Sequence, residues 1–368
     1  MHIKITRTEL LKAINITEKA IQSHVVIESL KGIKIKAEQG KVTFTAQKDD
    51  LAIEYVIEEN LSVVTEGEII VPSSYLGIIV KKTIEEEFEI LNEENVIFLK
   101  TKKSKIKLTG YDISSYPVVN FNLDEMPITL STDFFVNGFN KTKYSATEDA
   151  IKPILKGINF KFSNNVLTLG SSDAKRISIM KYNINSSNDL EFTLGKTIYS
   201  DLTKILEIIK TKTINIKSNG SQLLIEADQI VIRAKLLDGE YPNLERVIPT
   251  QNRFSFEVKT NDIQIVLEKI LYLSSKEKGN VTINIDNDLL VLSSIFKDLG
   301  TIEEKVAIIG LQGSPFKISF DPRFLIEAIQ ALNCEEIYLQ FVDEISGFIV
   351  KEKNGDNVLH VISPIRLS

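Results

Sequence analysis

The sequence repeats one arrangement of secondary structure six times: a short strand, an amphipathic helix and then three strands. Six segments have the apolar spacing of a helix, and a short alternating strand precedes each one. These helices are predicted to begin near Thr6, Pro72, Ser131, Tyr199, Thr260 and Asp321. The starts are about 60 residues apart, and a unit of that size is too small to bury a good core alone. The period therefore constrains the fold more than any single motif does.

Helix-capping residues support two of these starts. Ser131 and Asp321 can each accept a hydrogen bond from an unpaired amide of the first turn. Pro322 suits the first helical position, where no backbone N–H is needed. In the fifth helix, apolar residues recur at roughly helical spacing and are expected to bury one stripe. They are Ile263, Ile265, Val266, Ile270 and Leu273.

Between the helices, apolar and polar residues alternate with a period of two, and turn residues interrupt them. This pattern predicts antiparallel strands joined by tight turns. The predicted strand segments are residues 32–57, 88–108, 158–169, 214–227, 281–294 and 348–362. The last segment turns at Asn354-Gly355-Asp356, because Asn and Gly tolerate positive φ.

Pairing neighbouring units gives three α+β domains, each built from two βαβββ units with two helices packed on antiparallel sheets. Polar, turn-rich stretches at residues 122–127 and 247–253 would separate the pairs. We therefore predict domains at residues 1–124, 127–248 and 251–368. The alternative is that three ordinary α+β domains have this spacing by coincidence.

The composition excludes several classes of protein. Hydrophobic residues make up 43% and charged residues 26% of the 368 residues, which excludes a disordered chain, a collagen-like repeat and a coiled-coil rod. The single Cys excludes an internal disulfide and a Cys-based zinc site, and the three His lie far apart. No metal and no cofactor is therefore expected. A cytoplasmic protein is expected, because the sequence has no signal peptide and no apolar run of about 20 residues.

No motif predicts catalysis. The sequence lacks the phosphate-binding pattern GxxxxGK[ST], a GxGxxG after a strand, and the pattern GxSxG. A nucleotidyl transferase would need carboxylates that converge on a metal ion, and no spacing here predicts them. A β-rich interaction module unrelated to DNA remains an alternative. A sequence-specific DNA-binding protein is disfavoured, because no helix-turn-helix or basic region is present. The net charge of −6 argues against coating of nucleic acid but permits a local basic surface.

Four stretches carry a resemblance to a known family. They are residues 171–177 (SSDAKRI), residues 236–249 (LLDGEYPNLERVIP), Asn333-Cys334-Glu335 after the sixth helix, and residues 360–367 (HVISPIRL). Together with the repeat, they resemble the bacterial DNA sliding clamp, the beta subunit of the DNA polymerase III holoenzyme, over the whole chain. The resemblance implies three tandem DNA-clamp domains and a head-to-tail homodimer ring, with helices lining the hole and sheets outside.

The resemblance implies a processivity factor without a catalytic site of its own. A closed ring stays on duplex DNA topologically, and contacts to phosphates alone carry no sequence information. The implied partners are duplex DNA of any sequence, a second copy of the chain, the clamp loader, the replicative polymerase catalytic subunit, translesion polymerases and mismatch-repair proteins. A membrane is not among them.

The resemblance also implies a groove between the second and third domains that binds a short peptide with Leu or Phe anchors. A few buried contacts would provide most of the binding energy. The implied pocket residues are Leu155, Ser172, Asp173, Ala174, Lys175, Arg176, Ile177, Pro242, Arg246, Val247, Phe324, Val361, Ile362, Ser363, Pro364, Ile365, Arg366 and Leu367. Arg176, Arg246 and Arg366 are expected to form its polar rim.

Basic residues on or beside the helices are expected to face DNA. Family alignment favours Lys81, Lys82 and Lys196, and it places His24 where the family often has Arg. Lys12 and Lys204 are further candidates. A mildly basic hole would let a chain of net negative charge track DNA without the tight phosphate contact that impedes sliding.

A lysine-rich segment at residues 99–108 is expected to be the edge strand of the first domain. Lysines commonly protect a sheet edge from aggregation, and that is one interpretation. The other is a dimer contact with the acidic segment around residues 301–304. The dimer residues implied by the family are Ile106, Tyr272, Leu273, Glu303 and Glu304.

Overall fold

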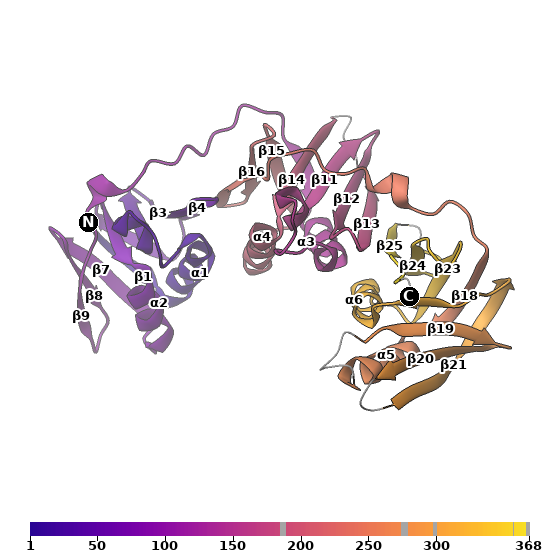
Figure 1. Cartoon of the computed structure of the whole chain (residues 1–368). Coiled ribbons are helices and arrows are strands. Elements are labelled where there is room, and N and C mark those ends of the chain that lie inside the picture. The colour runs from indigo at the N-terminus through magenta and orange to yellow at the C-terminus, as the bar shows by residue number, and fades with distance from the viewer. Residues whose placement is uncertain (185–188, 274–278, 297–299, 356, 366–368) are drawn as a thin grey trace. The chain divides into compact units, whose positions relative to one another are not determined.

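A computed structural model describes residues 1–184, 189–273, 279–296, 300–355 and 357–365 of the chain (Figure 1). These residues form two compact units. The first unit comprises Met1–Val136 and Thr197–Leu236, and the second unit comprises Asn137–Lys196 and Leu237–Ser368. The division falls within one helix and at the start of another, so each unit is built from two separate stretches of chain.

The first unit contains two complete helices and most of the strands of the N-terminal half. Its elements are β1 (His2–Thr6), α1 (Arg7–Thr17), β2 (Gly32–Glu38), β3 (Lys41–Lys48), β4 (Leu51–Ile57), β5 (Leu61–Thr65), β6 (Gly67–Pro72), α2 (Ser73–Lys82), β7 (Glu87–Glu93), β8 (Val96–Lys100), β9 (Lys105–Thr109), β10 (Ile128–Ser131), β15 (Thr213–Ser218), β16 (Gln222–Ala227) and β17 (Ile230–Lys235). Helices α3 (Thr132–Thr142) and α4 (Lys196–Ile209) belong to both units, because the division cuts them.

The second unit contains the remaining strands and the last two helices. Its elements are β11 (Gly157–Ser163), β12 (Val166–Ser172), β13 (Arg176–Asn183), β14 (Leu190–Gly195), β18 (Phe254–Lys259), α5 (Thr260–Leu273), β19 (Val281–Asp286), β20 (Leu289–Phe296), β21 (Gly300–Gly313), β22 (Ile318–Phe320), α6 (Pro322–Leu332), β23 (Glu336–Phe341), β24 (Phe348–Glu352) and β25 (Val358–Ile362).

The predicted repeat is present along the described residues. The run of strand, helix and three strands begins at β1, β6, β10, β14, β18 and β22, and ends at β4, β9, β13, β17, β21 and β25. Strand β5 is an addition between the first two runs. One predicted boundary is wrong: α4 begins at Lys196, not near Tyr199.

Strands from distant parts of the sequence meet within each unit. The first unit has a five-stranded sheet, β5-β1-β7-β8-β9, and an eight-stranded sheet, β10-β15-β16-β17-β4-β3-β2-β6. The second unit has a twelve-stranded sheet, β14-β11-β12-β13-β25-β24-β23-β18-β21-β20-β19-β22. We call the antiparallel pair β4·β17 the first joint and the antiparallel pair β13·β25 the second joint.

The predicted cap is confirmed at α6, and a backbone hydrogen bond marks the start of α3. The side chain of Asp321 accepts a hydrogen bond from the Arg323 amide (3.0 Å), and Pro322 occupies the first turn of α6. At the start of α3, the Thr132 amide donates to the Lys212 carbonyl (2.9 Å), which continues the β10·β15 ladder into the helix.

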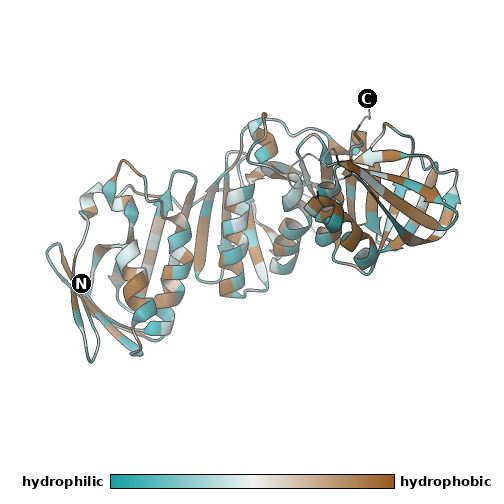
Figure 2. Cartoon of the chain, turned by 60° about the horizontal axis from the view of Figure 1, so that its bottom comes forward, coloured by the Kyte–Doolittle hydropathy of each residue, from teal (hydrophilic) through white to brown (hydrophobic). Residues whose placement is uncertain are grey.

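The helices bury one apolar side each, and both hydropathy colours occur along them (Figure 2). In α5 the buried residues are Ile263, Val266, Leu267 and Ile270. Their spacing of three and four residues matches the helical period. The predicted stripe is wrong at Ile265 and Leu273, which point away from this side and are 52% and 38% exposed.

Candidate functional site

The second unit contains a pocket of about 1300 Å3. Four distant stretches of chain line it: the segment before β11, the turn between β12 and β13, the linker before β18, and residues of α6 and its following strands. The lining residues are Thr147, Asp149, Ala150, Ile151, Lys152, Leu155, Ser172, Asp173, Ala174, Lys175, Arg176, Ile177, Pro242, Asn243, Leu244, Arg246, Val247, Ile248, Pro249, Thr250, Gln251, Arg323, Phe324, Glu327, Val342, Ser346, Gly347, Val361 and Ser363. A pocket of this size and mixed lining suits a ligand with apolar and polar groups.

The second joint forms one wall of this pocket. Its register places Ile177 opposite Val361 and Ser178 opposite His360. Since successive side chains of a strand point to opposite faces, Ile177 and Val361 line the pocket while Ser178 and His360 lie on the other face. All four side chains are buried.

The turn before β13 is held by its own side chains. The Ser172 hydroxyl donates to the Arg176 carbonyl (3.0 Å) and accepts from the Ala174 amide (3.1 Å). Asp173 accepts from the amides of Lys175 (3.0 Å) and Arg176 (3.1 Å). Ala174 has a φ of 70°, a left-handed conformation that favours glycine, so these bonds hold a strained residue in place.

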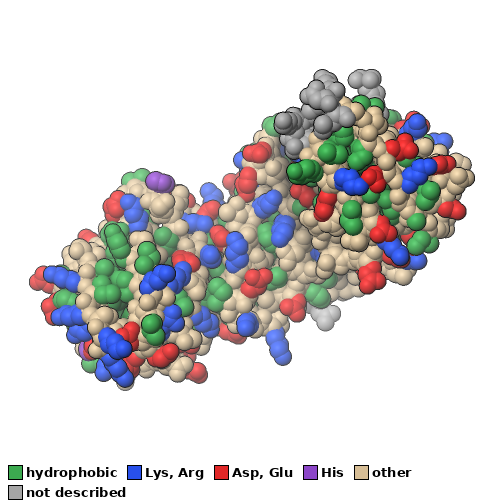
Figure 3. All heavy atoms as spheres, turned by 90° about the horizontal axis from the view of Figure 1, so that it is seen from below, with side chains coloured by type: hydrophobic (Ala, Val, Ile, Leu, Met, Phe, Trp, Pro, Cys, Tyr) green, Lys and Arg blue, Asp and Glu red, His purple; other side chains and the backbone are tan. Residues whose placement is uncertain are grey.

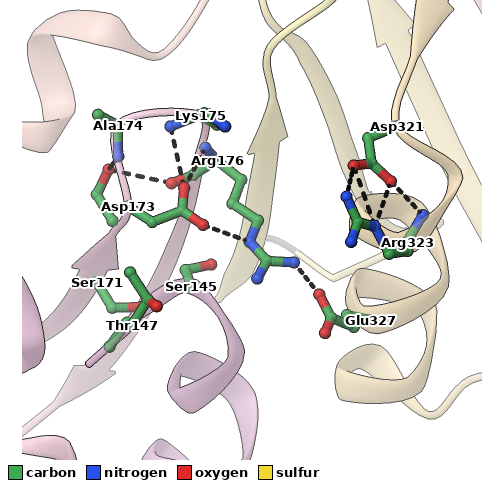
Figure 4. Close-up of polar contacts among 12 residues, drawn as sticks. Ser145, Thr147, Ser171, Asp173, Ala174, Lys175, Arg176, Asp321, Arg323 and Glu327 are labelled. Carbon is green, nitrogen blue, oxygen red and sulfur yellow. Dashed lines mark hydrogen bonds and ion pairs between the residues drawn. The ribbon is translucent and has the colours of Figure 1, made fainter. Parts of the chain in front are cut away.

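Arg176 lies in the pocket wall and is only 9% exposed. Its Nε donates to Asp173 (3.0 Å), and its Nη1 forms an ion pair with Glu327 of α6 (Figure 4). The guanidinium carbon also lies 5.1 Å from the ring centre of Tyr144 and 4.5 Å from that of Phe324. Cation–π contacts of this kind stabilise a desolvated guanidinium. Arg176 therefore connects β13 to α6, whereas we expected it at the polar rim.

A buried polar cluster lies on the far side of the second joint. The Ser178 hydroxyl contacts the Ser145 hydroxyl (2.5 Å) and His360 Nδ1 (3.1 Å), and the His360 ring packs edge-on against Tyr144. Burial, together with the nearby Lys141 ammonium, lowers the pKa of His360 to about 3. The imidazole is therefore neutral at physiological pH.

Two residues anchor the stretches of chain that border the pocket. The Lys196 ammonium donates to the Ala146 carbonyl (2.7 Å), next to the lining residues Thr147–Lys152. The Tyr241 hydroxyl accepts from the Ser172 amide (3.1 Å), and burial raises the pKa of that hydroxyl. Lys196 thus anchors residues 147–152, which we call the pocket lip, and Tyr241 anchors the β12–β13 turn.

Most of the implied pocket residues are brought together. Those that line the pocket are Leu155, Ser172, Asp173, Ala174, Lys175, Arg176, Ile177, Pro242, Arg246, Val247, Phe324, Val361 and Ser363. Ile362, Pro364 and Ile365 are not among the lining residues, and Ile362 is buried in the core of the unit. Arg366 and Leu367 lie outside the described residues.

Sequence reasoning missed several lining residues, notably Asp149, Lys152, Asn243, Arg323 and Glu327. Arg323 and Glu327 lie on α6, one turn apart, and Glu327 contacts Arg176 of β13, which is distant in sequence. Asp149 and Lys152 are close in sequence to the predicted residue Leu155, and Asn243 follows the predicted residue Pro242. Only this closeness could have indicated them.

The residues expected to face DNA are in different local environments. His24, Lys81 and Lys82 are exposed, and Lys81 forms an ion pair with Glu18 (3.5 Å). Lys196 is half-buried, and this burial lowers its pKa. Figure 3 shows Lys and Arg side chains spread among acidic and hydrophobic ones in both units.

Lys12 and Lys204 have partners within the first unit. Lys12 lies 5.5 Å from the ring centre of Tyr55, and Lys204 forms a long ion pair with Asp201 (3.9 Å). Lys204 remains exposed despite its ion pair.

The residues expected at a dimer contact lie on exposed elements. Residues 99–108 are not one strand, because a turn at Thr101–Ser104 separates β8 from β9. The Thr101 hydroxyl accepts from the Ser104 amide and stabilises that turn. Ile106 lies in β9 and is half-buried.

On the second unit, Tyr272 is 82% exposed and Leu273 is 38% exposed at the end of α5. Glu303 is exposed in β21, and Glu304 forms an ion pair with Lys269 (2.6 Å). These groups are therefore on the surface of their unit, although one of the two carboxylates already has a partner.

The described ranges contain neither a membrane-spanning helix nor a cluster of metal ligands. No helix there is long and apolar enough to cross a membrane. No group of three or more His, Cys, Asp or Glu side chains could hold a metal ion.

Comparisons with known proteins give one consistent result. Three family models match consecutive parts of the chain: DNA polymerase III beta subunit, N-terminal domain (residues 1–120), central domain (129–243) and C-terminal domain (245–366). The beta sliding clamp of Halalkalibacterium halodurans is 29% identical, with 100% of both chains covered. That of Staphylococcus epidermidis is 27% identical, with 100% of this chain and 99% of that protein covered.

Solved structures agree. The beta subunit of the DNA polymerase of Streptococcus pyogenes superposes with a TM-score of 0.95 at 24% identity, and the beta chain from Streptococcus pneumoniae with 0.95 at 25%. Both matches cover 100% of each chain. The predicted three-domain clamp fold is confirmed. The chain belongs to the family of the DNA polymerase III beta subunit, the beta sliding clamps, which are accessory processivity factors and not catalytic subunits.

Proposed function

We propose that the pocket of the second unit binds a short linear peptide carrying Leu or Phe anchors. The observation that carries this proposal is the convergence of Leu155, Ile177 and Val361, three buried apolar side chains from distant stretches, on one cavity. Val247 adds an apolar side chain at the mouth that is 57% exposed. A few such pockets for large apolar side chains provide most of the binding energy in peptide recognition.

The peptides would come from proteins that work on DNA with the clamp. We assign them to the replicative polymerase catalytic subunit, the clamp loader, translesion polymerases and mismatch-repair proteins, all acting in the cytoplasm. The clamp tethers these proteins to duplex DNA, and nucleotide addition and ATP hydrolysis remain with them.

Val247→Asp tests the peptide site. Because Val247 is exposed, the folded chain should tolerate a carboxylate there, while an apolar anchor at the mouth would lose its contact. Fluorescence polarisation with a labelled clamp-loader or polymerase tail peptide should detect binding to the wild type and a loss of at least tenfold in the variant, which is about 1.4 kcal/mol. Val118→Asp, at a site in the first unit that is 98% exposed, is the control, because it adds the same charge on the surface away from the pocket. Equal affinity of all three proteins would contradict the assignment.

A head-to-tail homodimer follows from the pattern of the joints. Each repeat ends in a strand, and two pairs of these strands already meet, β4 with β17 and β13 with β25. Of the repeat-ending strands, β9 and β21 are left. β9 is the last strand of its sheet, and residues Gly300–Ala307 of β21 pair only with β20 among the described strands. We propose that β9 of one copy pairs with β21 of another.

The two existing joints predict the register of this third joint. At the first joint, the residue opposite Ile232 is Ile53, which faces Ala46 of β3 on its other side. At the second joint, Ser178 holds the same position between His360 and Ser171. In β21 the matching residue is Ile302, opposite Ser294 of β20, and in β9 it is Ile106, opposite Leu99 of β8.

Transferring the register places Ile106 of one copy opposite Ile302 of the other. It also places Lys105 opposite Glu303, so opposite charges face each other across the antiparallel pair. Such cross-strand pairs stabilise a sheet by about 0.2–1 kcal/mol each. The exposed Tyr272 and Leu273 of α5 would add an apolar contact beside these strands.

Disulfide trapping tests the register. Residues directly opposite in an antiparallel pair have Cα atoms about 4.5–5.5 Å apart, which suits a disulfide. Ile106→Cys combined with Ile302→Cys should give a covalent dimer on a non-reducing gel. Ile106→Cys with Thr301→Cys, whose side chain would face the other side of the sheet, should not. Crosslinking of the second pair alone would overturn the register.

The ring would encircle duplex DNA, with His24, Lys81, Lys82 and Lys196 facing it and Lys12 and Lys204 beside them. The support for this is their basic character and their positions on or next to helices. Loading onto a nicked circular plasmid tests encirclement: the protein should stay bound through gel filtration and should be lost once the plasmid is cut. Equal retention on linear DNA would contradict a topological link.

We retain domain boundaries at residues 1–124, 127–248 and 251–368. The exposed stretches around Leu123–Met126 and Thr250–Arg253 support them, because boundaries usually fall in exposed linkers. Limited proteolysis should cut first at these two stretches.

A further inference from the structure

The pocket of the second unit carries more positive than negative side chains, although the chain as a whole has a net charge of −6. Its basic lining residues are Lys152, Lys175, Arg176, Arg246 and Arg323. Its acidic lining residues are Asp149, Asp173 and Glu327. The charge of the lining is thus opposite in sign to that of the whole chain, and the side chains that have no partner within the unit are the ones that a ligand would meet.

Two of the basic side chains already have partners. Arg176 is shared between Asp173 and Glu327 and lies between two aromatic rings. Arg323 donates from Nε to Asp321 (2.9 Å) and is drawn back toward the start of α6 (Figure 4). The carboxylates of Asp173 and Glu327 are correspondingly neutralised. These groups build the wall, and their charges are largely satisfied within the unit.

The other three basic side chains are different. Lys152, Lys175 and Arg246 are exposed, and none forms an ion pair with any residue in the part of the chain that the structure describes. They come from the segment before β11, the β12–β13 turn and the linker before β18. Asp149 is the third lining carboxylate; it forms no ion pair with another described residue and offsets only one of these charges.

We infer that the pocket selects a linear peptide in which acidic residues flank the apolar anchors. This inference rests on the proposed function, since it specifies the chemistry of the same peptide. The apolar anchors would enter beside Leu155 and Val361, and the flanking carboxylates would meet Lys152, Lys175 and Arg246 at the mouth. Charges at the rim of an interface act mainly on association rate and partner choice.

The expected preference is moderate, because exposed ion pairs each contribute little. Two such pairs should make a peptide with acidic flanks bind about threefold to tenfold more tightly than one with neutral flanks. Screening should reduce that ratio as ionic strength rises. The apolar contacts should depend little on salt.

Three short fluorescein-labelled peptides with the same Leu and Phe anchors test the inference. Their flanking positions carry Asp, Asn or Lys. Fluorescence polarisation with the full-length protein should give the order Asp, then Asn, then Lys, from tightest to weakest. If the three peptides bind with one affinity, the inference is overturned while the pocket assignment stands. If none binds, the proposed function itself fails.

Charge-removing variants locate the preference. Lys175→Gln and Arg246→Gln should each reduce the Asp-to-Asn affinity ratio, and the two together should bring it close to one. Lys317→Gln is the matched control, because it removes one exposed charge of the second unit that does not line the pocket. An equal reduction by Lys317→Gln would show that only net charge matters and would overturn the inference.

Discussion

The two joints have the same backbone and different side chains. In the first joint the Lys235 amide donates to the backbone carbonyl of Asp50, and the Val56 amide donates to that of Gln229, both at 2.9 Å. In the second joint the Ser363 amide donates to the backbone carbonyl of Lys175 (2.9 Å), and the Lys181 amide donates to that of Asn357 (2.8 Å). These bonds close the two strand pairs at matching places, so the ladders are equivalent.

The side chains at the centre of each joint differ in polarity. Ile53 and Ile232 face each other in the first joint, and both are fully buried. Ser178 and His360 face each other in the second joint and form part of a buried polar cluster. At the end of the ladder, the first joint has buried Leu51 where the second has Arg176.

One backbone arrangement therefore serves two purposes in this chain. The first joint is closed with apolar side chains, as in an ordinary core. The second joint contains groups that need hydrogen-bond partners, and the large pocket lies against its other face. Buried polar residues that have few possible hydrogen-bond partners favour one arrangement of the chain. Such an arrangement keeps Ile177 and Val361 in fixed positions in the pocket wall.

The largest effect is expected at the first joint. Ile232→Asn would bury an amide between Ile53 and Ile225, which are both fully buried, so the free energy of unfolding should fall by about 4 kcal/mol. Urea unfolding followed by circular dichroism measures this loss. Val231→Asn, one residue away and half-buried, should cost about 1 kcal/mol or less. Similar losses in both variants would contradict the complete burial of Ile232 in the first joint.

A smaller, pH-dependent effect is expected at the second joint. Burial lowers the pKa of His360 to about 3, whereas an unfolded chain would have its ordinary value near 6.5. The unfolded state therefore binds a proton that the folded state does not, and this contribution to stability is present above pH 6.5 and is lost as the pH falls toward 3. The loss is about 1.4 kcal/mol per pH unit in that window.

His360→Leu should remove this dependence. Between pH 6.5 and pH 5, wild type should lose about 2 kcal/mol more stability than the variant in parallel urea titrations. The comparison of slopes, and not of absolute stability, is the readout, because the leucine also changes packing. Parallel slopes would show that His360 is not held neutral by burial.

The smallest effect is expected where the pocket lip is anchored. Lys196→Met removes the hydrogen bond to the Ala146 carbonyl, so the segment Thr147–Lys152 should become less ordered and peptide affinity should fall about threefold. Lys196→Arg keeps a donor and should restore most of the affinity. If Lys196→Met changes only the salt dependence of DNA binding, the residue acts on phosphates instead.

The repeat can be predicted from the sequence because periodicity and turn residues are local signals. Asp321 with Pro322 marks a helix start by local chemistry, and the structure agrees. The start of α4 is missed because Gly195, the residue before the helix, has no side-chain oxygen that could mark it as a cap. The turn at Thr101–Ser104 is missed because it contains no Gly or Pro. The Ser104 amide donates to the Thr101 hydroxyl and holds the turn instead.

The pocket depends on pairings that no local pattern reveals. Apolar segments such as 177–180 and 358–362 are recognisable as strands, but nothing in either one specifies the other as its neighbour. The family resemblance supplies the lining residues that match its motifs, whereas Glu327 follows only from the packing of α6. Arg176 illustrates the limit: its position is predicted, and its role in joining two elements is not.

The alternation along β13 has a consequence for how this chain can change. Ile177 and Ser178 are neighbours that serve opposite sides of one sheet. A substitution at either position alters one side alone, whereas a single-residue insertion would exchange the two and put a hydroxyl in the cavity and an isoleucine among the polar groups. Descendants of this sequence are therefore free to vary the chemistry of the groove, but the length of that strand is not free to drift.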